Sequence, residues 1–282
     1  MVGETECCDE DITPESDEKI NSLMLDLESE LQCNGLIVLI FNPHISQGAL
    51  IEGDMQKNIA AFLDGLKNNN ATVLLYGLGG CFTEGLMLAH TIRKKFSHFN
   101  TLVPSICASA LCLTVLKSDN LKILKNGCLT QIDPVIVHDG KPIRAIKYLH
   151  DLDEETKQNC QSMFRYAEQQ IIDLISNKPS LFNHSKREFD FADKDDIITL
   201  FMNKDEHSDG IKKMEFQYRL DNFNVEYDDN PELLNKSMNL ITEVINVLNE
   251  QQERYFLGCT YETKLNDKTK KTERQGKLLY CP

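Results

Sequence analysis

The sequence lacks the features that mark membrane proteins and nucleic-acid-binding proteins. Its longest apolar runs, such as GLIVLIF at 35–41, fall far short of the ~20 residues that cross a bilayer, so no membrane span is expected. It has no long cluster of lysine and arginine before its C-terminal tail, and 44 acidic against 30 basic residues give a net charge of −14. Because nucleic acid and anionic membranes both attract basic surfaces, neither is expected as the main partner.

The cysteines are numerous, but they show no metal-binding or disulfide spacing. The ten cysteines form no CxxC pair and no CxxC followed by an HxxxH array. This spacing is typical of reduced thiols that fill a core, so neither a zinc site nor a disulfide framework is expected, and no cofactor is implied. The acidic segment 1–16 lacks the basic-then-apolar pattern of a secretory signal, which favours a cytoplasmic location.

The sequence does contain an alternation of short apolar strands and amphipathic helices. With 282 residues the chain is long enough to bury a sizeable core. Apolar, β-branched runs predict parallel strands at 36–41, 72–76 and 101–104, and helix-period segments follow them. This β-α-β-α order is typical of a parallel sheet covered by helices, and we therefore predict an α/β fold.

The C-terminal half is predicted to be mainly helical, with helix-period segments at 152–176, 194–202, 210–220 and 231–252. The last segment carries an apolar stripe made of Leu233, Met238, Ile241, Ile245 and Leu248. One small domain would leave part of this stripe uncovered, so an oligomer with this helix at an interface is expected. The tail after it fits either a hairpin or a flexible arm. We divide the chain into a disordered N-terminus (1–15), a core domain (16–227) and a C-terminal helix and tail (228–282).

Two β-α junctions place groups suited to acyl transfer at the same edge of the sheet. Gly79 and Gly80 end a strand and lead into a helix, which exposes backbone N–H groups suited to an anion or a developing oxyanion. In the next unit Ser109 starts an apolar helix near the carboxyl ends of the strands, where α/β proteins bind ligands. A serine in this position is more often a helix cap than a nucleophile, and the matching Gly-Gly favours the nucleophile.

Three segments of the sequence match the signatures of a known family. They are GLGGCFTEGLMLAHTIRKKF (77–96), VPSICASALCLTVLKSDNLKILKNGCLTQIDPVI (103–136) and EHSDGIKKMEFQYRL (206–220). Together they resemble the serine dehydrogenase proteinase family of the ClpP/crotonase-like clan, to which signal peptide peptidase A is related. The resemblance spans residues 35–227 and implies a ClpP/crotonase-like core of repeated β-α units with a helical C-terminal extension.

The resemblance also implies roles for individual residues. Ser109 corresponds to the family nucleophile, and Gly80 and Ala110 would supply the oxyanion N–H groups. The IDP at 132–134 corresponds to the segment that closes the site, and His207 corresponds to the histidine of the late motif.

Two departures from the family pattern bear on activity. Gly77 and Leu78 stand where the family has Thr-Pro, and Leu111 stands where the family has the glycine after Ser-Ala. Leu111 would crowd the turn that forms the oxyanion pocket. These departures favour a second hypothesis, in which the protein is a non-catalytic scaffold that keeps the fold for assembly or partner binding.

The general base is left open among four downstream residues: Lys141, Lys147, His138 and His207. The clan uses either a Ser-Lys dyad or a Ser-His-Asp triad. Lys147 is favoured because it lies 38 residues after Ser109, close to the interval in related Ser-Lys members, among apolar neighbours that would desolvate it. His138 beside Asp139 is the alternative for a triad.

These features predict a serine peptidase that cleaves peptide or protein substrates through an acyl-enzyme on Ser109. The resemblance further implies a closed homo-oligomer. A third hypothesis, besides the inactive scaffold, is acyl-CoA chemistry of the crotonase type, in which the same oxyanion geometry stabilises an enolate. That chemistry needs a carboxylate near the oxyanion pocket, and neither strand-end segment supplies an obvious one.

Overall fold

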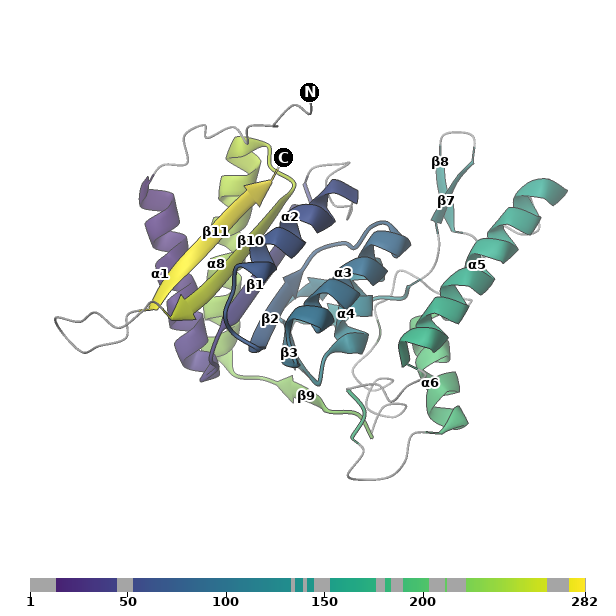
Figure 1. Cartoon of the computed structure of the whole chain (residues 1–282). Helices are drawn as coiled ribbons and strands as arrows, with labels where there is room; N and C mark the ends of the chain where they lie inside the picture. The colour runs from purple at the N-terminus through teal and green to yellow at the C-terminus, as the bar shows by residue number, and fades with distance from the viewer. Residues whose placement is uncertain are drawn as a thin grey trace.

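The computed structural model contains one large mixed sheet with helices on both faces (Figure 1). Its parallel strands are β1 (Leu36–Phe41), β2 (Asn70–Tyr76), β3 (His98–Val103), β5 (Asn120–Leu124) and β9 (Val225–Asp228). The antiparallel strands β10 (Tyr255–Glu262) and β11 (Arg274–Cys281) extend the sheet beyond β1, giving the order β11-β10-β1-β2-β3-β5-β9. The structure describes residues 14–44, 53–132, 135–138, 141–144, 153–175, 181–183, 190–202, 211, 222–262 and 274–281.

The helices and the smaller sheets surround this sheet. The helices are α1 (Pro14–Leu31), α2 (Gly53–Asp64), α3 (Phe82–Lys95), η1 (Ser109–Leu111), α4 (Cys112–Lys117), α5 (Glu154–Ile175), α6 (Phe191–Phe201) and α8 (Pro231–Gln251). Two small sheets pair β4 (Ile106–Cys107) with β6 (Cys128–Leu129), and β7 (Val135–His138) with β8 (Lys141–Arg144).

The predicted α/β class and the predicted parallel strands are confirmed, with β3 beginning earlier than expected. Helix α1 begins at Pro14, inside the segment predicted to be disordered, because proline suits the first turn of a helix. Residues 1–13 and most of the helix predicted at 210–220 lie outside the described residues. Ile211 is described, and it forms a single β-bridge to Leu129.

Strand β1 is buried on both faces, as its uninterrupted apolar sequence predicts. Successive side chains of a strand point to opposite faces of the sheet. One face joins the core formed with α2, α3 and α4 through Ile37, Leu39 and Phe41. The other face joins the core formed with α1 and α8 through Leu36, Val38 and Ile40. The sheet is therefore the middle layer between two helical layers, and the site lies at its carboxyl edge.

The apolar stripe of α8 is buried within the chain, which corrects the expectation that it would need a partner. Leu233, Ile241 and Leu248 are at most 3% exposed and pack in the core that includes Ile20 and Met24 of α1. A helical stripe predicts burial but does not show which element covers it, and here α1 and the sheet supply the cover. The α8 stripe is therefore not available as an oligomer interface.

The tail forms a hairpin that completes the sheet, which decides between the two alternatives for this segment. Strand β10 pairs antiparallel with β1, and β11 pairs with β10. The Leu36 N–H donates to Thr260 Oγ1 at 2.9 Å. The boundary predicted at 227/228 falls inside β9, and the segments on both sides of it contribute strands to one sheet.

Asp228 ties β9 to β5 and to the start of α8. Its carboxylate accepts a hydrogen bond from the Asn230 N–H at 2.8 Å. It also forms an ion pair with Lys122 Nζ at 3.0 Å. The Asn230 N–H, and then Lys122, hold the pKa of Asp228 below its ordinary value against the opposing effect of burial. Since the folded-state pKa is the lower one, the ionised carboxylate stabilises the fold at neutral pH, and this contribution is lost as the pH falls through the folded-state pKa, below about 4.

We therefore expect Asp228→Asn to lower the free energy of unfolding at neutral pH and to flatten its decline in acid. Thermal unfolding followed from neutral pH to about pH 3 measures both effects. Asp229→Asn, at the exposed neighbouring position, is the matched control and should behave as the wild type. An acid decline that is equally steep in wild type and Asp228→Asn would contradict this role.

Candidate functional site

The candidate site lies where the loops after β2 and β3 meet at the carboxyl edge of the sheet. Gly77 donates its N–H to the Ile106 carbonyl at 3.0 Å, and its own carbonyl accepts the Ala108 N–H at 3.0 Å. These two bonds hold the glycine loop at 77–80 alongside the segment that carries Ser109. The expectation that the two β-α junctions share one edge of the sheet is confirmed.

Gly79 is in direct contact with the backbone around Ser109. A Cβ built onto Gly79 would lie 2.5 Å from the Ala108 carbonyl oxygen, 2.7 Å from Ser109 Cβ and 3.0 Å from Ala110 N. Its φ of +93° also belongs to a region that side chains disfavour. Only glycine therefore allows the loop to approach Ser109 this closely.

Ser109 has a strained backbone and is half-buried. Its φ is +51°, a left-handed conformation that costs a residue with a side chain about 1–2 kcal/mol. Ala108, not Ser109, is the N-cap of η1, and its φ of −110° is the extended conformation usual for a cap. The helix-cap interpretation of Ser109 is therefore wrong. Strain of this kind persists where neighbouring contacts hold the residue in place.

Thr130 supplies one of those contacts. The Ser109 N–H donates to Thr130 Oγ1 at 2.9 Å. Sequence reasoning missed this threonine because the two residues lie 21 positions apart and on different elements. Its place directly after the β6 strand, inside the CLTQIDP segment, was the available signal.

Removing the Thr130 hydroxyl should make the position of the Ser109 backbone less well defined. Thr130→Val keeps the shape but leaves the Ser109 N–H without its acceptor, so we expect Ser109 to react with an electrophilic serine probe about tenfold more slowly, as for a modest misplacement of a reacting group. Thr130→Ser retains the hydroxyl and should restore most of the rate. Equal rates in wild type and Thr130→Val would show that this bond does not position Ser109.

The residues after Ser109 begin a helix beside the glycine loop. Ala110 is 1% exposed, and α3 packs so closely on it that a Cβ at Gly85 would lie 2.7 Å from Ala110 Cβ. The first N–H groups of a helix have no partner within the helix. A Cβ at Gly79 would lie 3.0 Å from Ala110 N, so the Ala110 N–H and the glycine loop lie on two segments in contact, as an oxyanion hole requires.

The side chain of Leu111 packs into the core. It is fully buried in the core with α2 and α3, and its Cδ1 lies 3.2 Å from the position of a Cβ at Gly77. The branched side chain therefore packs between the glycine loop and the core. A Cβ at Gly77 would also lie 2.8 Å from Phe41 Cβ, so glycine at 77 leaves room for both Phe41 and Leu111.

The chain is similar in fold to several solved protease structures, whereas no protein-family model and no curated protein matches it. ClpP1 from Listeria monocytogenes matches with 13% identity, 70% of this chain and 94% of that chain covered, and a TM-score of 0.42. A mutant of the 1510-N membrane-bound stomatin-specific protease in complex with a substrate peptide matches with 13% identity, 72% and 80% coverage and a TM-score of 0.44. The ClpP protease catalytic domain from Plasmodium falciparum matches with 10% identity, 74% and 91% coverage and a TM-score of 0.41. These similarities concern the fold. Any inference about chemistry has to come from the residues of the site.

The candidate bases are not placed by the described residues. Lys147 and His207 lie outside them, and so does Asp139. His138 and Lys141 lie at the turn ends of β7 and β8, where they pair in register, but their side chains are not described. No residue in the described ranges hydrogen-bonds Ser109 Oγ.

Three cysteines pack next to the Ser109 turn. The thiol of Cys112 lies 3.1 Å from the Cys107 carbonyl oxygen and 3.2 Å from the Thr130 carbonyl oxygen. Burial raises the pKa values of the Cys107 and Cys128 thiols, so both stay protonated at neutral pH. The described cysteines are free thiols, and their predicted role as core residues is confirmed for Cys107, Cys112, Cys160 and Cys259.

The described residues contain neither a metal-ligand cluster nor a membrane-spanning helix. In those ranges, no group of three or more His, Cys, Asp or Glu side chains is placed to hold a metal ion. No helix within them is long and apolar enough to cross a membrane.

Proposed function

We propose that this protein is a serine peptidase in which Ser109 is the nucleophile and the N–H groups of Gly80 and Ala110 stabilise the oxyanion. The observation that carries the proposal is the left-handed backbone of Ser109, held against Gly79 at the carboxyl edge of the sheet. A strained, half-buried serine next to a glycine loop and a helix start is an arrangement suited to acyl transfer. A serine that only fills space would not require this strained backbone.

The proposed reaction proceeds in two halves. Ser109 Oγ attacks the peptide carbonyl while its proton passes to the base, and the new C–O bond places the negative charge on the carbonyl oxygen. The tetrahedral intermediate then expels the amine, which takes that proton from the base, and leaves an acyl-enzyme. Water repeats the sequence and releases the acid. We propose Lys147 as the base, with His138 and His207 as the alternatives.

We further propose a family, a substrate and an assembly for this peptidase. The three signature segments at 77–96, 103–136 and 206–220 support membership of the serine dehydrogenase proteinase family. That membership would bring peptide or protein substrates and a closed homo-oligomer. Because the α8 stripe is buried, the contacts between copies would have to use other surfaces.

A non-catalytic scaffold is the second candidate function. The observation that favours it is the departure from the family pattern at Gly77 and Leu78, where the family has Thr-Pro, and at Leu111, where the family has glycine. Such a protein would keep the fold and the strained turn without a base to activate the serine.

Labelling with a fluorophosphonate separates the two candidates, because this reagent mimics the tetrahedral geometry of acyl transfer. We expect wild type to be labelled and Ser109→Ala to be unlabelled, while Ser105→Ala, a half-buried serine on the same loop, is labelled as wild type. Lys147→Ala should slow labelling by about 10²-fold if this lysine is the base. Absence of labelling in the folded wild type between about pH 6 and 10, where a shifted lysine titrates, would favour the scaffold.

A further inference from the structure

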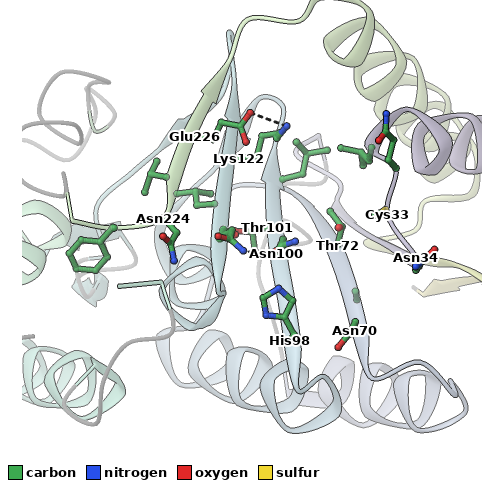
Figure 2. Close-up of a pocket in the computed structure, with 18 of the residues that line it drawn as sticks. Cys33, Asn34, Asn70, Thr72, His98, Asn100, Thr101, Lys122, Asn224 and Glu226 are labelled. Carbon is green, nitrogen blue, oxygen red and sulfur yellow. Dashed lines mark hydrogen bonds and ion pairs between the residues drawn. The ribbon is translucent and has the colours of Figure 1, made fainter. Parts of the chain in front are cut away.

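A polar hollow lies across the starts of the parallel strands, at the opposite edge of the sheet from Ser109 (Figure 2). Its volume of about 690 Å³ falls within the range of ~300–1,000 Å³ that is usual for ligand pockets. We call it the amide groove and define it by the lining residues Asn70, Thr72, Asn100, Asn120 and Asn224. Asn70 and Asn120 are the first residues of β2 and β5, and Asn224 directly precedes β9.

The groove exists because the helical layer over this face of the sheet stops short. The core under α1 and α8 takes one leucine from each of three neighbouring strands, namely Leu74, Leu102 and Leu124. Two residues earlier on each strand, the same face carries Thr72, Asn100 and Lys122. Since parallel sheets are normally covered on both faces, this polar strip is an unusual opening in the fold.

The groove presents unpaired hydrogen-bond donors and acceptors in a fixed row. Thr72 pairs in register with Asn100, and Asn100 with Asn120, on strands about 4.8 Å apart. Asn120 Nδ2 donates to Asn100 Oδ1 at 2.7 Å, and Asn224 Nδ2 donates to the Asp119 carbonyl at 3.2 Å. Among the described residues, these bonds leave Asn100 Nδ2, Asn120 Oδ1 and Asn224 Oδ1 without a partner. The row therefore offers donors and acceptors together.

The charged side chains around the groove are already paired. Lys122 Nζ lies 3.0 Å from Asp228 and 3.2 Å from Glu226, and His98 Nδ1 lies 3.0 Å from Asp119. A charged ligand would therefore have to compete with contacts that these side chains already make. An anion would also be repelled by the net charge of −14.

We propose that the amide groove binds a neutral, hydroxyl-rich ligand, namely an oligosaccharide. Each hydroxyl both donates and accepts, so a row of hydroxyls matches the mixed row of amide groups. A ligand with acceptors alone leaves Asn120 Oδ1 and Asn224 Oδ1 unpaired, and one with donors alone leaves Asn100 Nδ2 unpaired.

An extended peptide is a poorer match for the groove. Peptides that bind a sheet usually add a strand to an edge whose backbone is unpaired. The groove crosses β2, β3 and β5, each of which is paired on both sides, and reaches the edge strand β9 only at one end, at Val225 and Glu226. Across β2, β3 and β5 only side chains are left to bind a ligand, and the row defined above consists of amides and one hydroxyl.

Nuclear magnetic resonance of the asparagine side-chain amides in the full ¹⁵N-labelled chain tests the proposal. The probes are maltotriose, cellotriose and N,N′,N″-triacetylchitotriose at millimolar concentration. We expect at least one probe to shift the Asn100 and Asn120 amide signals saturably, while the signal of Asn246, exposed on α8, stays in place. Asn100→Ala combined with Asn120→Ala should weaken binding by about tenfold, since it removes several hydrogen bonds to the ligand.

Matched controls make the outcome decisive. Asn246→Ala should bind the probe as tightly as wild type. The proposal is overturned if none of the three trisaccharides moves the groove signals, if the double variant binds as tightly as wild type, or if neutral peptides shift these signals and the sugars do not. The wild-type titration decides the matter even where the double variant does not fold.

Discussion

Gly79→Ala should reduce fluorophosphonate labelling of Ser109 by about 10²-fold or more, because a displacement of about 1 Å at a reacting group has effects of this size. The added Cβ would lie 2.5 Å from the Ala108 carbonyl and 2.7 Å from Ser109 Cβ, so one of the two loops must move. The φ of +93° adds backbone strain. We therefore expect the free energy of unfolding to fall by more than about 1 kcal/mol as well.

The control for this prediction is Gly65→Ala. Gly65 is exposed in the turn after α2 and is not among the glycines with positive φ. It should change neither labelling nor stability appreciably. Rates of labelling and thermal unfolding of the three proteins measure both effects, and a Gly79→Ala protein that labels at the wild-type rate would show that the glycine loop does not support Ser109.

Phe256→Ala should lower the free energy of unfolding by about 3–5 kcal/mol, the usual cost of removing a fully buried aromatic ring. Phe256 is 0% exposed and packs in the core between the sheet and helices α1 and α8. Its ring also lies against Gly258, where a Cβ would approach it to 2.7 Å. Urea denaturation measures the loss.

Met87→Ala is the matched surface control for Phe256→Ala. Met87 is 49% exposed on α3, so its replacement should change the free energy of unfolding by no more than about 0.5 kcal/mol. Similar stabilities for Phe256→Ala and Met87→Ala would show that the C-terminal hairpin contributes little to the core, as a flexible arm would.

Much of the fold was predictable from local pattern. The run GLIVLIF indicates a strand buried on both faces without any knowledge of its neighbours, and β1 has that environment. The stripe of α8 indicates burial equally well, but it does not distinguish a partner subunit from α1, which lies more than two hundred positions away in the chain. The tail was ambiguous for the same reason, because β10 is defined by its pairing with β1, and β11 by its pairing with β10.

The candidate site was predictable to the level of its loops. Strand-to-helix junctions at Gly79–Gly80 and at Ser109 placed both groups at one edge, because parallel strands end on the same side. The left-handed backbone of Ser109, its bond to Thr130 and the inward direction of Leu111 follow from contacts between distant segments. The amide groove was missed because polar residues at the starts of strands look like ordinary turn residues.

The pairing of β1 with β10 has a consequence for the synthesis of the chain. The Leu36 N–H and its acceptor in Thr260 are 224 residues apart. At ordinary translation rates of about 5–20 residues per second, β1 waits on the order of 10–45 s for this neighbour to emerge. During that time one side of an apolar strand has no backbone partner, and such edges are sites of intermolecular association. Nascent chains of this protein should therefore depend on chaperones more than its compact native sheet suggests, and slower translation of the later helices would increase that dependence.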